Sequence, residues 1–369
     1  MPNYKLKENG GEMKTLFDST QVAGMKMKNR FVRSATHDGR ADASGHVTEK
    51  LIRHYENLAK GGVGTIITGL TNVTDIEKIV PGQMAIYNDS FIPEYKVLTD
   101  TVHSHKVNII AQLVCNGAQN RSKNEGVLWA PTVIEDMKPV AGIKEMTQDD
   151  ISIMKEAFIG GAIRAQKAGF DGVQLHAAHG YLLSRFLTPY FNRRTDEYGG
   201  STENRARVVI EICNGIRNAL GADYPVWVKI NCDDFMEDGL TFNECKHICK
   251  MMEDAGVTAI EISGGTILSR TGEGAVRKIT TETESYFMRY AAEIAEETEV
   301  PIICVGGHRD FYKLSNILNQ SKIEYISLSR PLIREPELIN RWATGDSSPA
   351  KCISCTKCFG IETECIFNK

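Results

Sequence analysis

Three side chains that could carry chemistry, His176, His179 and Tyr181, lie within six residues of one another. Imidazole rings can donate hydrogen bonds to a substrate oxygen, and a tyrosine hydroxyl can deliver a proton. A zinc site is the alternative, because histidine is a common metal ligand. However, no Asp, Glu or Cys stands at a matching strand end to complete a tetrahedral set. We therefore interpret the three residues as catalytic.

A second group, nearer the C-terminus, combines glycine pairs with a hydroxyl and a guanidinium. It consists of Gly265, Gly306, Gly307, Ser329 and Arg330. Backbone amides, a hydroxyl and a guanidinium are groups that bind phosphate. Each glycine taken alone is explained equally well by a tight turn. Because Arg330 stands beside the hydroxyl, we favour a phosphate site.

Two further residues, Gln112 and Lys229, lie inside apolar segments. A buried lysine could form a Schiff base, as in an aldolase, or could hold an anionic ring. A glutamine amide both donates to and accepts from a planar heterocycle. With a phosphate anchor, this pair suits flavin mononucleotide (FMN), and Lys229 would stabilise negative charge at the N1/O2 edge of the ring. No Rossmann fingerprint is present, so a nicotinamide coenzyme would dock at the same site.

The elements that must position these residues alternate between short apolar runs and longer amphipathic segments. The predicted strands are 30–36, 64–69, 108–114, 172–176, 226–231, 259–263, 302–305 and 325–329. Predicted helices include 48–60, 148–168, 202–220, 242–255 and 284–298. Eight near-continuously apolar strands favour an α/β fold of the (β/α)8 TIM barrel type over an open, doubly wound sheet. Barrel active sites form at strand C-termini, where the candidate residues stand.

Composition narrows the class of protein further. The chain has 369 residues, a net charge of −4 and no basic block, so we expect no nucleic-acid partner. No apolar run approaches the roughly 18 residues of a membrane span, and the N-terminus lacks the apolar region of a signal peptide. We expect a flexible leader at 1–13, an FMN-binding barrel at 14–345 and a cysteine-rich tail at 346–369. Six cysteines scattered through apolar segments favour a reducing cytoplasm.

The tail carries the other four cysteines, Cys352, Cys355, Cys358 and Cys365. A C-x2-C-x2-C run with one more thiolate has the density of an iron–sulfur or zinc site. Free thiols, for example at a contact between subunits of a homo-oligomer, are the alternative. A cluster here would be expected to exchange electrons with a partner protein that docks nearby.

The chain resembles the old yellow enzyme family, and more closely the flavin domain of 2,4-dienoyl-CoA reductase and 2-enoate reductase. The resemblance runs from about Leu16 to about Trp342, and its most specific stretch, at 170–205, reads FDGVQLHAAHGYLLSRFLTPYFNRRTDEYGGSTENR. Supporting stretches are NRFVRSATHDG, GGVGTIITG, VKIN, EISGG, VGGHR and ISLSRPLIREPELI.

The resemblance implies a role for each candidate residue. His176 and His179 would bind the oxygen of an electron-withdrawing group, and Tyr181 would be the proton donor. The predicted FMN-binding residues are Ala35, Thr36, His37, Gln112, Lys229, Gly265, Gly306, Gly307, Ser329 and Arg330. In the larger relatives, a [4Fe-4S] cluster sits where the cysteine tail begins, with a longer spacing between its ligands.

The implied reaction is that of an ene-reductase. Hydride passes from NADH or NADPH through flavin N5 to the β-carbon of an α,β-unsaturated carbonyl or carboxyl compound, and Tyr181 protonates the α-carbon. A flavin-dependent demethylase or dehydrogenase on the same barrel is the alternative. Where many relatives have His-Ala-Gly-Arg, this chain has Cys115-Asn116-Gly117-Ala118, which leaves substrate preference open. The larger relatives continue into a second flavin domain, so we expect electrons to enter at the barrel or from a separate partner.

Overall fold

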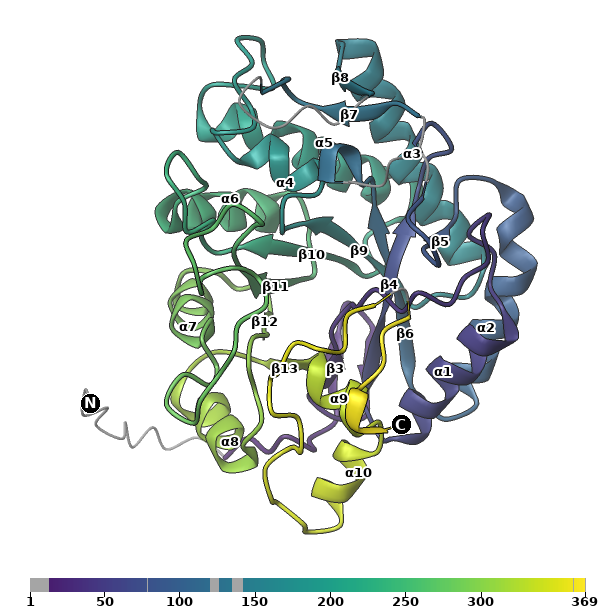
Figure 1. The fold of residues 1–369 in the computed structure, drawn as a ribbon, viewed down its shortest axis with the longest axis vertical. Coiled ribbons are helices and arrows are strands. Elements are labelled where there is room, and N and C mark those ends of the chain that lie inside the picture. Colours follow the sequence, from purple (N-terminus) through teal and green to yellow (C-terminus); the bar gives the residue numbers. More distant parts are fainter. Residues whose placement is uncertain (1–12, 78, 120–125, 135–141, 361, 369) are drawn as a thin grey trace.

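Eight parallel strands close into a barrel in a computed structural model that describes residues 13–369 except 78, 120–125, 135–141, 361 and 369 (Figure 1). The strands are β3 (Phe31–Arg33), β4 (Thr65–Asn72), β6 (Asn108–Val114), β9 (Gly172–Ala177), β10 (Val226–Asn231), β11 (Ala259–Ser263), β12 (Ile302–Cys304) and β13 (Tyr325–Leu328). They are hydrogen-bonded in that order, and pairings of β3 with both β4 and β13 close the ring. The predicted TIM barrel is confirmed. The predicted leader lies, apart from Met13, outside the described residues.

Helices connect successive strands and cover the outside of the barrel (Figure 1). They are α1 (Glu49–Lys60), α2 (Ile92–His103), α3 (Gln148–Lys167), α4 (Leu182–Leu187), α5 (Thr202–Leu220), α6 (Phe242–Asp254), α7 (Met288–Glu297), α8 (Phe311–Gln320), α9 (Arg330–Arg334) and α10 (Leu338–Ala343). Side-chain caps fix where several of them begin. Thr147 and Thr241 each form a capping box, with Asp150 and Glu244, so that exposed backbone N–H groups of α3 and α6 are satisfied.

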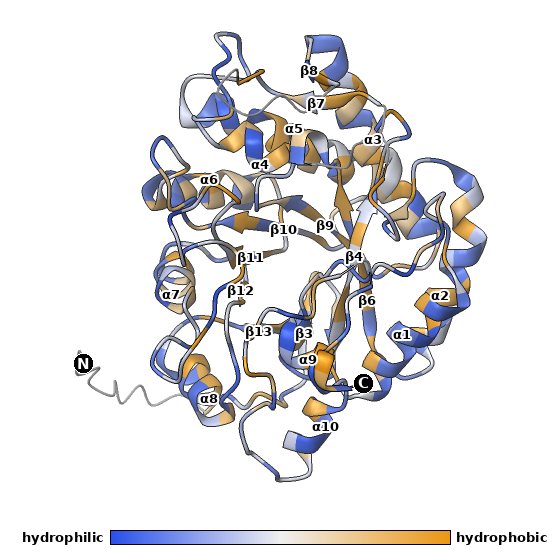
Figure 2. Cartoon of the chain, viewed as in Figure 1, coloured by the Kyte–Doolittle hydropathy of each residue, from blue (hydrophilic) through white to orange (hydrophobic). Residues whose placement is uncertain are grey.

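The core has two parts, one between the barrel and the helices and one inside the barrel. The inner part lies toward the amino ends of the strands and contains Trp227, which is fully buried. A hairpin of β1 (Thr20–Val22) and β2 (Met25–Met27) adds three apolar side chains to it. In Figure 2 the strands are mostly orange, whereas the outer helices carry blue positions facing outward. Apolar packing therefore fills one end of the barrel and leaves the other end for polar side chains.

Polar side chains on neighbouring strands are aligned at that other end. Gln112 on β6 pairs in register with Gln174 on β9, and Lys229 on β10 pairs with Glu261 on β11. Residues in register on parallel strands project from the same face of the sheet. Lys229 is also in register with His176. The strand pairing thus gathers amide, ammonium, carboxylate and imidazole groups inside the barrel.

Three loop regions differ from the sequence-based expectation. The helix predicted at 284–298 begins at Met288, because Ser285 has a positive φ of 60° and the N–H of Tyr286 bonds to the carbonyl of Gly306. The preceding loop is therefore long, and its end packs onto the barrel mouth. Short strands not foreseen are β5 (Met84–Ala85), beside β4, and a small ribbon of β7 (Leu128–Ala130) with β8 (Ile143–Glu145). Short 3₁₀ helices occupy Asp89–Phe91, Gly117–Gln119 and Ile366–Asn368.

The tail, residues 346–369, runs back from α10 past α9 to the loop after β3 (Figure 1). The Thr363 hydroxyl donates to the carbonyl of His37 at 2.5 Å, and Arg40 pairs with Glu364 at 3.1 Å. These contacts attach the tail to the same strand end that carries Thr36 and His37. Among the described residues, no helix is both long enough and apolar enough to cross a membrane.

Candidate active site

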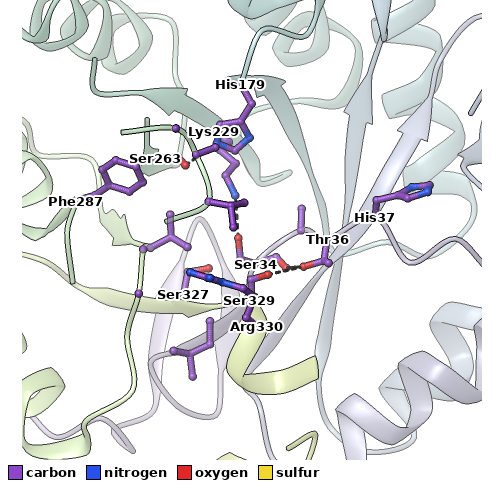
Figure 3. Close-up of a pocket in the computed structure, with 18 of the residues that line it drawn as sticks. Ser34, Thr36, His37, His179, Lys229, Ser263, Phe287, Ser327, Ser329 and Arg330 are labelled. Atoms are coloured by element: carbon purple, nitrogen blue, oxygen red, sulfur yellow. Dashed lines mark hydrogen bonds between the residues drawn. The ribbon is translucent and has the colours of Figure 1, made fainter. Parts of the chain in front are cut away.

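A cavity of about 530 Å³ opens at the carboxyl ends of the strands (Figure 3). Residues from most strand ends contribute to its lining, together with the loop after β11 and the tail. The predicted site residues that line it are Ala35, Thr36, His37, Gln112, His176, His179, Tyr181, Lys229, Gly306, Gly307, Ser329 and Arg330. The structure thus brings together twelve of the thirteen residues predicted to act in catalysis or flavin binding.

His176, His179 and Tyr181 form one aromatic group on the wall built by β9. The His176 ring lies 5.3 Å from the ring of His179 and 4.6 Å from that of Tyr181, measured between centroids. Tyr181 occupies the N-cap position of α4, with an extended backbone. The three side chains, predicted from their spacing, therefore present one face to the cavity.

A left-handed backbone at His179 turns its ring toward the neighbouring strand. Its φ is +62°, a conformation that is uncommon for residues other than glycine. Its backbone N–H donates to the side chain of Asn231 at 3.2 Å, and its Nε2 lies 2.7 Å from the hydroxyl of Ser263. The two contacts hold the ring in a single orientation.

Burial sets the protonation of this group. Burial, followed by the charges of His179 and Lys229, lowers the pKa of His176 well below its usual range. Burial and Lys229 lower the pKa of His179 to about 3. Burial and Glu77 raise the pKa of Tyr181 to about 12. At neutral pH the wall therefore presents two neutral imidazoles and a protonated phenol, all of which can donate hydrogen bonds.

The floor of the cavity is cationic and polar. The Lys229 ammonium donates to the hydroxyl of Ser34 at 2.9 Å (Figure 3). It also lies 3.4 Å from the carboxylate of Glu261. Gln112 donates from its amide to Gln174 at 2.8 Å. A Schiff base requires a lysine amine that is free to attack a carbonyl, whereas Lys229 is hydrogen-bonded to Ser34 and paired with Glu261. The geometry therefore favours charge stabilisation by Lys229 over the lyase alternative.

The opposite side of the cavity has the features of an anion site. The Thr36 and Ser329 hydroxyls are 2.9 Å apart (Figure 3). Arg330 is anchored by donating to the carbonyl of Arg277 at 2.9 Å. Gly306 and Gly307 have φ of +118° and +79°, respectively. A Cβ on either would lie 2.7 Å from an aromatic ring of the loop after β11. Glycine is therefore required at this turn both by its backbone and by its neighbours.

Gly265 is the predicted flavin contact that does not line the cavity. Its N–H donates to the carbonyl of Asp233 at 2.9 Å, and its own carbonyl accepts from Asn231 at 3.2 Å. Its φ of +79° and a clash between any Cβ and Glu273 explain the glycine as a turn residue. The structure thus accounts for this glycine as a turn residue, and its contact with the flavin stays a prediction.

Several lining or supporting residues were not predicted. Tyr286, Phe287, Ser354 and Phe359 reach the cavity from the long loop and the tail. No strand pattern marks them, so no signal in the sequence could have placed them. Strand alternation, by contrast, could have identified Gln174 and Glu261, because residues two apart on a strand point to the same face. Gln174 lies two residues before His176, and Glu261 lies two residues before the predicted end of its strand at Ser263.

The tail cysteines surround a second, small pocket that also touches Arg330. All four are partly buried free thiols, whereas the six scattered cysteines are fully buried, as expected. Nevertheless, within the described part of the chain no three His, Cys, Asp or Glu side chains are arranged to hold a metal ion. The cluster therefore stays a prediction, and we assign no step to it. Iron and acid-labile sulfide analysis of anaerobically purified protein tests the predicted [4Fe-4S] cluster.

Comparison with known proteins identifies the family. The sequence profile described as "NADH:flavin oxidoreductase / NADH oxidase family" matches residues 15–347. The chain therefore belongs to this family, which is that of old yellow enzyme. The resemblance to this family, inferred from the sequence, is confirmed.

Two curated relatives illustrate the range of the family. An NADH oxidase of Thermoanaerobacter brockii is 32% identical over 92% of this chain and 52% of its own length. An NADPH dehydrogenase of Geobacillus sp. (strain WCH70) is 33% identical over 87% of this chain and 91% of its own length. The chain thus spans about half the length of the first relative and nearly all of the second.

Solved structures agree with the fold. A 2-naphthoyl-CoA reductase complex is 27% identical with a TM-score of 0.84, covering 92% of this chain and 54% of that one. The old yellow enzyme homologue from Zymomonas mobilis is 24% identical with a TM-score of 0.77, covering 96% and 98%, and supports the fold alone.

Proposed function

We propose that this chain is an FMN-dependent reductase of activated C=C bonds that takes its hydride from NADH or NADPH. One observation carries the proposal. Two neutral imidazoles and a protonated phenol share a single cavity with a cationic floor and a glycine–arginine anion site. The substrate class we propose is an α,β-unsaturated carbonyl or carboxyl compound.

The residues fit FMN in three respects. The turn at Gly306 and Gly307, which leaves no room for a Cβ, and the guanidinium of Arg330 suit its phosphate. Gln112 and Lys229 supply an amide and a cation for the N1/O2 edge of its ring. When bound, FMN supplies hydride transfer. Thr36, Ala35 and His37 line the remaining side of the cavity.

The wall built by β9 acts on the substrate. Ring nitrogens of His176 and His179 donate to the substrate oxygen and stabilise the enolate charge that develops there. Tyr181 holds a proton at its hydroxyl and delivers it to the α-carbon.

Spectroscopy tests the proposal directly. Purified protein should be yellow or turn yellow with FMN, lose that colour anaerobically with NADH or NADPH, and regain it on addition of an enone. A relative named N,N-dimethylglycine/sarcosine dehydrogenase is 28% identical, which favours amine oxidation as the second candidate. If N-methylated amines reduce the flavin and enones, enoates or enoyl thioesters do not reoxidise it, the protein is an amine dehydrogenase and the proposed reductase function is wrong.

Three expectations about the surroundings of the protein stay predictions. A homo-oligomer, a separate electron-transfer partner and a cytoplasmic location are not addressed by the geometry of the cavity. Light scattering of the purified protein tests the first, and copurification under anaerobic conditions tests the second. Localisation in intact cells tests the third.

A further inference from the structure

Glu261 is a charged residue with no access to solvent, in the middle of β11 behind the floor of the cavity. One carboxylate oxygen accepts from the hydroxyls of Ser34 and Ser327 at 2.7 and 2.8 Å. The other accepts from the Gln174 amide at 3.0 Å and lies 3.4 Å from the Lys229 ammonium. Burial alone raises the pKa of Glu261, but Lys229 and these three donors hold it below its usual value. The residue is therefore a fully satisfied carboxylate.

This carboxylate determines the direction of the hydrogen bonds around it, because an ionised carboxylate can only accept. Gln174 must turn its NH2 group toward Glu261, so its carbonyl faces Gln112 and accepts from the Gln112 NH2 at 2.8 Å. The carbonyl oxygen of Gln112 then points away from Gln174. Gln112 lines the cavity, whereas Gln174 and Glu261 do not. A residue without contact to the cavity thus decides which end of the Gln112 amide is offered as an acceptor.

The same carboxylate also sets the charge of the floor. Ser34 donates to Glu261 and in turn accepts from Lys229 at 2.9 Å. Lys229 and Glu261 together contribute no net charge, although only the ammonium lines the cavity. Charges in a buried setting are weakly screened, so loss of the carboxylate leaves a strong uncompensated cation there.

We propose that Glu261 is a positioning residue for the flavin edge: through Gln174, Ser34 and Lys229 it fixes the acceptor and the net charge that the cavity presents to the ring. This inference rests on the proposed binding of FMN. The N3–H of the ring is a donor that needs an acceptor, which the oriented Gln112 carbonyl supplies. The N1/O2 edge gains negative charge on reduction, and the Lys229–Glu261 pair limits how strongly that charge is stabilised.

Two variants separate the two effects. In Glu261→Gln, the cation loses its partner and the amide chain can reverse. We expect the midpoint potential of bound FMN to become more positive and the Kd for FMN to rise about tenfold or more. In Gln174→Met, the ion pair remains but Gln112 loses its orienting partner. We expect a similar rise in Kd with a much smaller change in potential.

A matched control is Glu335→Gln, which removes a buried carboxylate paired with Arg341 and Lys351 away from the cavity. It should leave the midpoint potential unchanged. The double variant Glu261→Gln with Gln174→Glu moves the carboxylate from β11 to β9, on the other side of β10. Because this exchange restores the total charge, it should return the potential toward the wild-type value. If Glu261 served folding alone, its variants would have a lower melting temperature, and their midpoint potentials would not follow the charge at this site.

The measurements are FMN fluorescence quenching for Kd and dye-coupled reductive titration for the potential. Wild-type protein that binds no FMN would sink the proposed function itself. Wild-type protein that binds FMN, together with a Glu261→Gln variant of unchanged Kd and potential, would overturn the role of Glu261. If Glu261→Gln does not fold, Gln174→Met decides the orienting role, and unchanged FMN affinity in that variant overturns it.

Discussion

The rings of His176 and Tyr181 stand 4.6 Å apart at an angle of 40°, so the imidazole and the phenol face the same cavity from one strand end. The imidazole is neutral and the phenol is protonated at neutral pH, because burial moves the pKa of each in the direction of its uncharged form. Binding of a substrate oxygen and donation of a proton are thereby divided between two neighbouring rings.

Removing the hydroxyl in Tyr181→Phe tests this division. Reduction of the alkene should slow by about 10²-fold or more, the usual contribution of a general acid. Reduction of the flavin by NADH or NADPH should change only a few-fold, since that step needs no proton from Tyr181. Stopped-flow measurement of the two half-reactions checks the split. Full turnover of an enone by the variant would rule out Tyr181 as the donor, provided that protonation limits the rate.

Acid sensitivity should follow from His179. Its folded-state pKa is about 3, below the ordinary value of 6.5. Between these values the unfolded chain takes up a proton that the folded chain does not, so the free energy of unfolding decreases as pH falls from 6.5 toward 3. The melting temperature of His179→Asn should therefore decrease less between pH 7 and pH 4 than that of the wild type, at equal ionic strength. An equal loss of melting temperature in the two proteins would show that His179 does not contribute to the acid sensitivity.

Arg330→Gln tests the anion site. Loss of a charged hydrogen-bond donor should weaken FMN binding by about tenfold to a hundredfold. Arg334 lies on the same helix but bonds to Asn368, outside the cavity. Arg334→Gln should bind FMN with wild-type affinity in the same fluorescence titration. Equal affinity of both variants would place the phosphate elsewhere.

Gly307→Ala and Gly272→Ala form a pair that separates backbone strain from crowding. Both glycines have positive φ, +79° and +85°, but only at Gly307 would a Cβ meet a neighbour, the Tyr286 ring at 2.7 Å. Gly272→Ala should cost about 1 kcal/mol of unfolding free energy. Gly307→Ala should cost about 1–3 kcal/mol more and also weaken FMN binding. Urea unfolding and FMN titration measure both, and equal costs would show that the turn at Gly307 is not crowded.

The barrel and most of the site could be predicted because they depend on local patterns. Apolar runs marked all eight barrel strands, and strand ends located His176, Lys229 and Arg330 at one mouth. Parallel pairing brings all strand ends to the same side, so sequence position there translates directly into spatial position.

The rest depended on long-range contacts that leave no pattern. Tyr286 reaches the cavity because its N–H bonds to Gly306 on a neighbouring strand end, and no periodicity encodes that bond. The role of Gly265 could not be decided from the sequence for a related reason, since a glycine after a strand has the same sequence signature whether it serves a turn or a ligand. The role of Glu261 required knowing which strands are neighbours, which the order of β9, β10 and β11 supplies.

Ser354 and Phe359 belong to the same short segment as the four partly exposed cysteines, yet they form part of the cavity wall. Alkylation or oxidation of those thiols would displace this wall, and it would also reach the small pocket that the cysteines share with Arg330. Thiol reagents would then inhibit like compounds directed at the active site. Loss of activity after such labelling is therefore no evidence that a cysteine takes part in catalysis. Slower labelling in the presence of a ligand would show that the tail packs more tightly against the occupied cavity.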